Sequence, residues 1–92
     1  IVDKIPVVLI ESHDPHEFFD RSTVYGCEDD PARFCFFSIA ALEYVKTISC
    51  DVIHLHDWHT ALIAPLAKEK YPEIKSKIIF TIHNLAYQGH CL

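Results

Sequence analysis

The stretch DVIHLHDWHT, residues 51–60, decides the fold because it joins a strand to the start of a helix. Its first six residues, 51–56, are rich in β-branched and aliphatic side chains, which predicts the strand. Residues 57–60 then turn the chain into a shorter helix that we expect to run to about Lys70. Pro65 fits this helix only if it falls among the first four residues, whose N–H groups have no partner inside a helix.

Segments on both sides continue this alternation of strand and helix. Residues 5–10 (IPVVLI) and 77–82 (KIIFTI) predict two further strands, the first of them buried on both faces. Asp29 and Asp30 precede Pro31, which is typical of a helix N-cap followed by proline at the first helical position, and apolar residues then recur at helical spacing to Ile48. The order strand, helix, strand, helix, strand predicts an α/β fold with a parallel sheet and flanking helices.

The composition argues against several classes of partner. Eight basic against thirteen acidic residues give a net charge of −5, without a Lys/Arg cluster for nucleic acid or an anionic membrane surface. No apolar run approaches the roughly 18 residues that span a bilayer. The four cysteines form no C-x-x-C pair and lie mostly among apolar residues, which favours buried, reduced thiols in a cytoplasm-like compartment. The chain starts at Ile1 and contains no methionine, so we expect a piece of a longer protein.

Polar side chains gather where the predicted strands end. The second strand ends in His54, His56, Asp57 and His59, and the third ends in His83 and Asn84. In open parallel sheets, ligands bind at the carboxyl ends of the strands. The sequence therefore predicts a functional site at this edge of the sheet.

A metal site is the first hypothesis. His54 and His56 project to one face of an extended strand, and Asp57 and His59 follow on the turn, so these side chains offer ligands to zinc or a similar ion. The spacing is against it, because the H-x-H-x-D-H pattern of metallo-β-lactamase-like hydrolases needs an aspartate where this chain has Trp58. The shorter H-x-H pattern of barrel amidohydrolases does match, but it is weak. A simpler alternative is that Asp57 caps the next helix while the histidines bind backbone carbonyls.

Recognition of a sugar or another polyol is the second hypothesis. The residues after the two strands provide hydrogen-bond donors and acceptors beside aromatic rings, with little positive charge: Asp57, His59, His83, Asn84, Tyr87 and Gln88. The alternative is an ordinary polar loop over residues 86–89, in which Gly89 supplies a positive φ. From the residues alone, all of these readings stay open.

Three blocks of sequence, in this order, resemble a known family. They are FDR (residues 19–21) with YGCEDD (25–30) and RF (33–34), then DVIHLHDWHTA (51–61), then FTIHNLAYQG (80–89). Together they resemble the N-terminal domain of bacterial and plastid glycogen/starch synthases, the retaining glucosyltransferases of family 5. The resemblance covers nearly all 92 residues.

The resemblance implies a fold, an activity and parts that this chain lacks. Residues 1–92 would be part of the N-terminal Rossmann-like domain of a GT-B fold, with the C-terminal nucleotide-sugar domain outside the chain. The family transfers glucose from ADP-glucose, or UDP-glucose in some members, to the non-reducing end of an α-1,4-glucan, without a metal or other cofactor. Its K-x-G-G-L loop and donor-diphosphate residues are not in this chain, so the 92 residues alone are expected to be inactive. The expected location is a bacterial cytoplasm or a plastid stroma.

The resemblance also implies roles for the strand-end residues. His83 matches the histidine whose backbone carbonyl faces the anomeric carbon of the donor and whose ring lies near the sugar hydroxyls. Asp57 matches an aspartate important for activity, and both residues are expected to be catalytic. The expected substrate-binding residues are His59, Asn84, Tyr87 and Gln88. A metal-dependent hydrolase, and a homologue that binds glucan without catalysis, are the alternatives.

Overall fold

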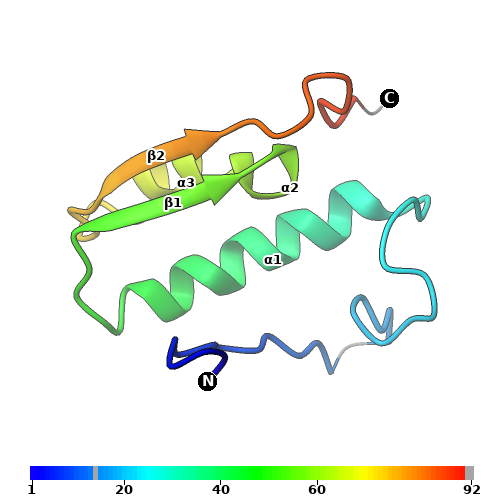
Figure 1. The fold of residues 1–92 in the computed structure, drawn as a ribbon, viewed down its shortest axis with the longest axis horizontal. Helices are drawn as coiled ribbons and strands as arrows, with labels where there is room; N and C mark the ends of the chain where they lie inside the picture. Colours follow the sequence, from blue (N-terminus) through cyan, green and yellow to red (C-terminus); the bar gives the residue numbers. More distant parts are fainter. Residues whose placement is uncertain (14, 91–92) are drawn as a thin grey trace.

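The computed structural model describes residues 1–13 and 15–90 (Figure 1). Its helices and strands, in chain order, are α1 (Asp30–Val45), β1 (Val52–His56), α2 (Trp58–Ala61), α3 (Ile63–Lys70) and β2 (Lys77–Thr81). β1 and β2 pair in parallel, with Val52 opposite Lys77 and His56 opposite Thr81. The predicted α/β class, a parallel sheet with flanking helices, is confirmed.

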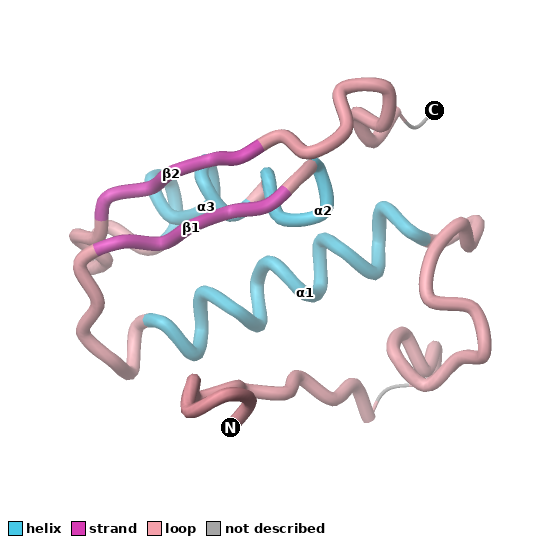
Figure 2. Tube along the Cα trace, viewed as in Figure 1, coloured by secondary structure: helices cyan, strands magenta, loops and turns pink. Residues whose placement is uncertain are grey.

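The helices connect the two strands and pack against the sheet. Parallel neighbours need a crossover connection, and α2 and α3 provide it between β1 and β2. α1 packs against both crossover helices, and Figure 2 shows it running back alongside β1. The core contains Leu42 from α1, Leu55 from β1, and Ile63 and Ala67 from α3. Burial of these apolar side chains fixes β1 relative to the helices, and β2 is held by its pairing with β1.

α1 begins where the sequence predicts, but not for the expected reason. Asp29 stands at the N-cap position, and Pro31 is the second residue of the helix, one place later than predicted. Asp29 makes no side-chain cap hydrogen bond, so this part of the prediction is wrong. Two nitrogens of the Arg21 guanidinium bind its carboxylate instead, at 2.6 and 2.7 Å. A two-point, charge-assisted pair thus takes the place of the expected cap.

The crossover is two short helices rather than the single helix expected to reach Lys70. The chain leaves α2 at Leu62, and α3 starts at Ile63. Pro65 is consequently the third residue of α3, where its missing N–H removes no helical hydrogen bond. The condition that the sequence set for Pro65 is therefore met.

Residues 5–10 do not form the predicted first strand. In the described part of the chain, the sheet contains β1 and β2 alone, and this segment shows only an isolated bridge between Val2 and Ile5. Val7, Val8 and Leu9 are 48%, 52% and 81% exposed, so the expected burial is also wrong. An extended segment becomes a strand only when a neighbouring strand binds its N–H and C=O groups. Figure 1 shows the segment running along α1 instead.

Two expectations from composition are also tested by the structure. None of the helices in the described residues has the length and apolar character needed to cross a membrane. Cys27, Cys35 and Cys50 are free thiols, as predicted, but they are only partly buried. Cys91 lies outside the described residues.

Candidate active site

The carboxyl ends of β1 and β2 meet at one edge of the sheet. Asp57 follows β1 directly, and His83 lies two residues beyond the end of β2. The Oδ1 atom of Asp57 accepts a hydrogen bond of 2.7 Å from the backbone N–H of His83 and a longer one of 3.4 Å from that of Asn84. The structure brings these three residues together, as the parallel arrangement predicts.

Asp57 has an unusual backbone and a stabilised carboxylate. Its φ of 60° and ψ of 179° lie in a region that residues other than glycine rarely adopt. Its pKa lies below the usual value, first because the backbone N–H of His83 binds the carboxylate and also because that of Asn84 does, which together outweigh desolvation. The alternative that Asp57 caps the next helix is wrong, since its side chain makes no cap hydrogen bond to α2.

Three histidines and a threonine form a row of contacts on one face of the sheet. His54 and His56 point to the same side, as strand alternation predicts, and their ring centroids lie 4.1 Å apart. His54 Nε2 lies 2.7 Å from Thr81 Oγ1, and His56 Nδ1 lies 3.0 Å from His83 Nε2. We call these four residues the histidine ladder.

The four residues of the metal hypothesis do not converge on one point. His54 and His56 belong to the histidine ladder, and the carboxylate of Asp57 faces the backbone after β2. The ring of His59 stacks on Trp58 instead, with centroids 4.5 Å apart. None of these four side chains takes part in a group of three ligand atoms close enough to share an ion. The geometry therefore does not favour the metal hypothesis.

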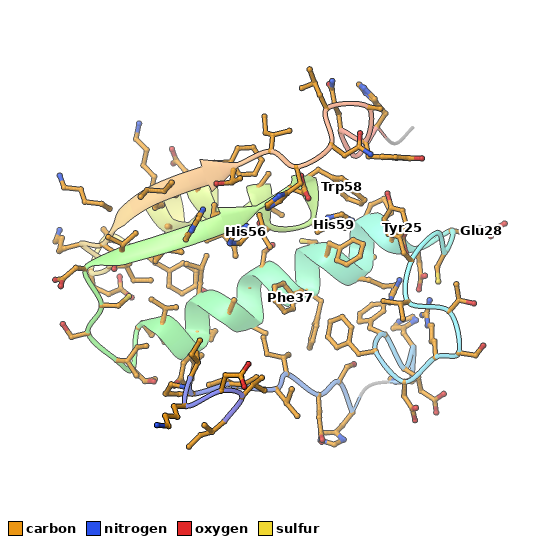
Figure 3. All side chains as sticks on the ribbon, viewed as in Figure 1. Tyr25, Glu28, Phe37, His56, Trp58 and His59 are labelled. Carbon is orange, nitrogen blue, oxygen red and sulfur yellow. The ribbon has the colours of Figure 1, made fainter. Side chains whose placement is uncertain are left out.

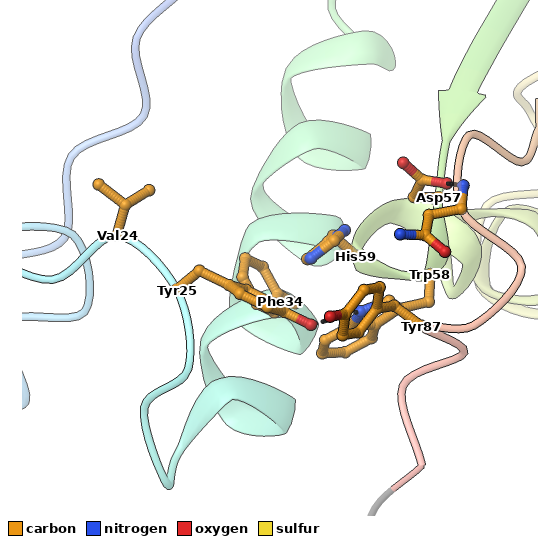
Figure 4. Close-up of a pocket in the computed structure, with 8 residues that line it drawn as sticks. Val24, Tyr25, Phe34, Asp57, Trp58, His59 and Tyr87 are labelled. Atoms are coloured by element: carbon orange, nitrogen blue, oxygen red, sulfur yellow. Dashed lines mark hydrogen bonds between the residues drawn. The ribbon is translucent and has the colours of Figure 1, made fainter.

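Aromatic side chains build a cavity beside Asp57 (Figures 3 and 4). The ring of Phe34 meets Trp58 edge-on at 5.2 Å and His59 at 4.8 Å between centroids. Tyr25 closes the group, because its hydroxyl accepts a hydrogen bond of 3.3 Å from the indole N–H of Trp58. The cavity has a volume of about 340 Å³ and is lined by Val24, Tyr25, Phe34, Asp57, Trp58, His59, Asn84 and Tyr87.

The expected substrate-binding residues divide between this cavity and its neighbour. His59, Asn84 and Tyr87 line the aromatic cavity. Gln88 does not; it lines an adjacent cavity of about 270 Å³, and its side-chain amide donates to the carbonyl of Leu85 at 2.8 Å. His83 lines neither cavity, since its ring belongs to the histidine ladder.

Trp58, Tyr25 and Phe34 line the aromatic cavity but were not predicted as site residues from the sequence. The sequence marked Trp58 only as the residue that breaks a metal pattern, although its place next to Asp57 was a usable signal. Gly89 has the predicted positive φ, 69°, and a Cβ there would lie 2.5 Å from Cδ2 of Trp58. The glycine therefore lets the loop after β2 pack directly on the indole ring.

Arg33 anchors the loop that carries Tyr25 to the cavity. It is 3% exposed. Its guanidinium donates to the carbonyl of Phe18 at 2.8 Å, to that of Val24 at 3.3 Å, and to the carboxylate of Asp30 at 2.7 Å. The loop before α1 is thus tied to the helix at points on both sides of residues 19–23.

The acidic residues at the start of α1 are structural rather than ligand-binding. Burial raises the pKa of Asp30, but the ion pair with Arg33 and two backbone N–H groups outweigh it, so the net shift is downward. Cys27, Asp29 and Asp30 are the sole group in the described chain with three ligand atoms within 4.8 Å of one another. Both carboxylates already carry an arginine partner.

Comparison with known proteins assigns the family. The family described as the starch synthase catalytic domain matches residues 1–92. Glycogen synthase from Protochlamydia amoebophila (strain UWE25) is 55% identical over 95 residues, which covers 98% of this chain and 19% of that protein. Glycogen synthase from Chlamydia abortus (strain DSM 27085 / S26/3) is 49% identical over 76 residues, covering 82% of this chain and 16% of that protein.

A solved structure gives the same result for the fold. The catalytic domain of starch synthase IV from Arabidopsis thaliana, bound to ADP and acarbose, is 45% identical with a TM-score of 0.81. The match covers 86% of this chain and 17% of that chain. Residues 1–92 therefore span less than a fifth of the relatives that they match. This chain belongs to the starch synthase catalytic domain family.

Proposed function

We propose that this chain supplies one wall of the active site of a retaining glucosyltransferase that transfers glucose from ADP-glucose to the non-reducing end of an α-1,4-glucan. Residues 1–92 would form part of its N-terminal Rossmann-like domain, and a C-terminal nucleotide-sugar domain would complete the cleft. The 92 residues alone should transfer no glucose. A bacterial cytoplasm fits the relatives from Protochlamydia and Chlamydia.

One observation carries the proposal: Asp57 holds the backbone of His83 and Asn84 at the sheet edge, beside the aromatic cavity. Glycosyl transfer develops positive charge at the anomeric carbon, and fixed dipoles stabilise such charge best. The carbonyl of His83 is such a dipole. Asp57 holds it in place, because its carboxylate binds the N–H of His83 and the N–H of Asn84, which belongs to the same peptide group as this carbonyl. We assign His83 as the catalytic residue that supplies this dipole and Asp57 as the one that holds it.

The cavity has the chemistry expected of a sugar site. Its aromatic walls suit the apolar faces of a pyranose ring, while His59, Asn84 and Tyr87 bring polar atoms for hydroxyl groups. Gln88 would contact substrate from the adjacent cavity. The relative bound to ADP supports a nucleotide-sugar donor, because ADP is what remains of ADP-glucose after transfer.

The proposal is tested with the full-length protein that contains this sequence. Incorporation of labelled glucose from ADP-glucose into glycogen is measured with and without EDTA, with UDP-glucose as the second donor. Transfer that survives EDTA is the expected result. No transfer from either donor would refute the proposal, and retention of glycogen without transfer would point to a non-catalytic glucan-binding homologue. Transfer abolished by EDTA would revive the metal hypothesis for His54, His56, Asp57 and His59.

A further inference from the structure

The contacts of the histidine ladder follow the register of the sheet. His54 lies opposite Ile79 but contacts Thr81, and His56 lies opposite Thr81 but contacts His83. Each of these two histidines therefore contacts the residue two positions beyond its register partner. Residues two apart in an extended chain share a face, so Thr81 and His83 present their side chains to the same side. Both histidines of β1 make the same diagonal contact, which indicates that the strand register itself places His56 against His83.

A hydrogen bond between two imidazole nitrogens has a strict requirement. One nitrogen must carry a proton and the other must be bare. When both rings are neutral, a proton on Nδ1 of His56 leaves Nε2 of His83 bare and puts the His83 proton on Nδ1. The opposite arrangement exchanges the roles. The tautomer of His83 is thus coupled to that of His56 through their 3.0 Å contact.

His83 is consequently held at two points by consecutive residues at the end of β1. The carboxylate of Asp57 binds its backbone N–H at 2.7 Å, and the ring of His56 binds its ring. The two rings are nearly parallel, at 18°, with centroids 5.3 Å apart. Within the described residues, no hydrogen bond to Nδ1 of His83 is formed, so this atom keeps its capacity to bind a ligand hydroxyl.

We propose that His56 is a positioning residue that fixes the ring orientation of His83 and couples the tautomer of His83 to its own. Its role in catalysis rests on the proposed glucosyltransferase function, because the His83 ring is expected to lie near the sugar hydroxyls. A ring held in one orientation presents Nδ1 to those hydroxyls at one defined position. A ring free to rotate presents it at many, and only a fraction of its orientations is productive.

Two variants of the full-length protein separate this role from simple packing. His56→Leu keeps apolar bulk but removes the ring nitrogen, and His56→Asn keeps a polar atom near the position of Nδ1. For His56→Leu we expect kcat with ADP-glucose to fall roughly tenfold, the loss of one hydrogen bond, with KM changed much less. His56→Asn should recover most of the activity. Thr81→Val, which removes the other contact of the ladder, is the matched control and should stay close to wild type.

A double-mutant cycle tests whether His56 acts through His83. In a His83→Ala background, His56→Leu should have no further effect on kcat, because the group that it positions is gone. Equal kcat for wild type and His56→Leu, or a full additional loss in the His83→Ala background, would overturn the inference while the glucosyltransferase function stands.

Crystal structures of the full-length variants give a readout that needs no activity. The His83 ring should keep its orientation in the wild type and in His56→Asn, and should leave it in His56→Leu. If the wild type transfers no glucose from either donor, the proposed function fails and these structures alone decide the inference. An unmoved His83 ring in His56→Leu would then overturn it.

Discussion

Replacing Arg33 with leucine should release the loop that carries Tyr25. The side chains of Arg33 and Asp30 are only 4% and 9% exposed. Leucine removes the guanidinium from Asp30 and from the carbonyls of Phe18 and Val24 at once. Removing one partner of a buried pair costs about 3–5 kcal/mol, because the other charge stays buried without its counter-ion. Asp30 keeps the hydrogen bonds from the backbone N–H groups of Gly26 and Cys27, so we expect the lower end of this range. The free energy that holds this loop on α1 should fall by that amount.

Hydrogen exchange of the full-length protein, read by mass spectrometry, measures this loss locally. A loss of 3 kcal/mol or more corresponds to roughly 100-fold faster exchange of the backbone amides in residues 18–30. Arg33→Leu combined with Asp30→Leu should recover part of the protection, since no charge is then left buried. The matched control is Arg21→Leu, whose pair with Asp29 is more exposed, at 24% and 37%, and whose effect should be much smaller. Wild-type exchange in Arg33→Leu, or equal acceleration in Arg21→Leu, would refute the reasoning.

Three further predictions concern Gly89, Asp57 and Asp30. Gly89→Ala should lower glucose transfer by about 100-fold, because its Cβ would displace the Trp58 ring; unchanged Trp58 packing in a crystal structure would contradict this. Asp57→Ala should lower kcat more than Asp57→Asn, since asparagine keeps an acceptor for the N–H of His83 and tolerates a positive φ; equal losses would show that the charge alone matters. The pKa of Asp30 is lowered by folding, so its stabilisation is complete above about pH 4, the unfolded value, and is lost as the pH falls through the folded value. The protection factors of residues 18–30, which correct for the pH dependence of intrinsic exchange, should thus be insensitive to that group from pH 7 to 5 and fall only below about pH 4.

The strands and helices that sequence reasoning predicted correctly are those specified by local patterns. Residues 51–56 and 77–82 carry strand-forming side chains, and β1 and β2 lie within these bounds. Pro65 limited where the crossover helix could begin, and α3 begins at Ile63 accordingly. Because the carboxyl ends of parallel strands lie at one edge, this rule alone predicted that Asp57 and His83 would lie close together, as they do.

The features that sequence reasoning missed depend on partners far away in the chain. Residues 5–10 have the composition of a strand, but pairing needs a neighbour, and composition does not say whether one lies alongside. Asp29 reads as an N-cap until Arg21 is seen to bind it from eight residues upstream. The aromatic cavity joins Tyr25 to Trp58 across 33 positions, so no local pattern reveals it.

Asp57 combines two requirements that few residue types meet together. A φ of 60° with a ψ of 179° at the end of β1 is ordinarily a glycine conformation, and other residues adopt it only at a cost. Glycine would offer no acceptor to the backbone after β2, and asparagine would offer a neutral one. Only aspartate turns the chain and also provides a charged oxygen for the N–H groups of His83 and Asn84. Because His56 precedes Asp57 directly and binds the ring of the same histidine, any shift of the β1 end must move both supports of His83 together.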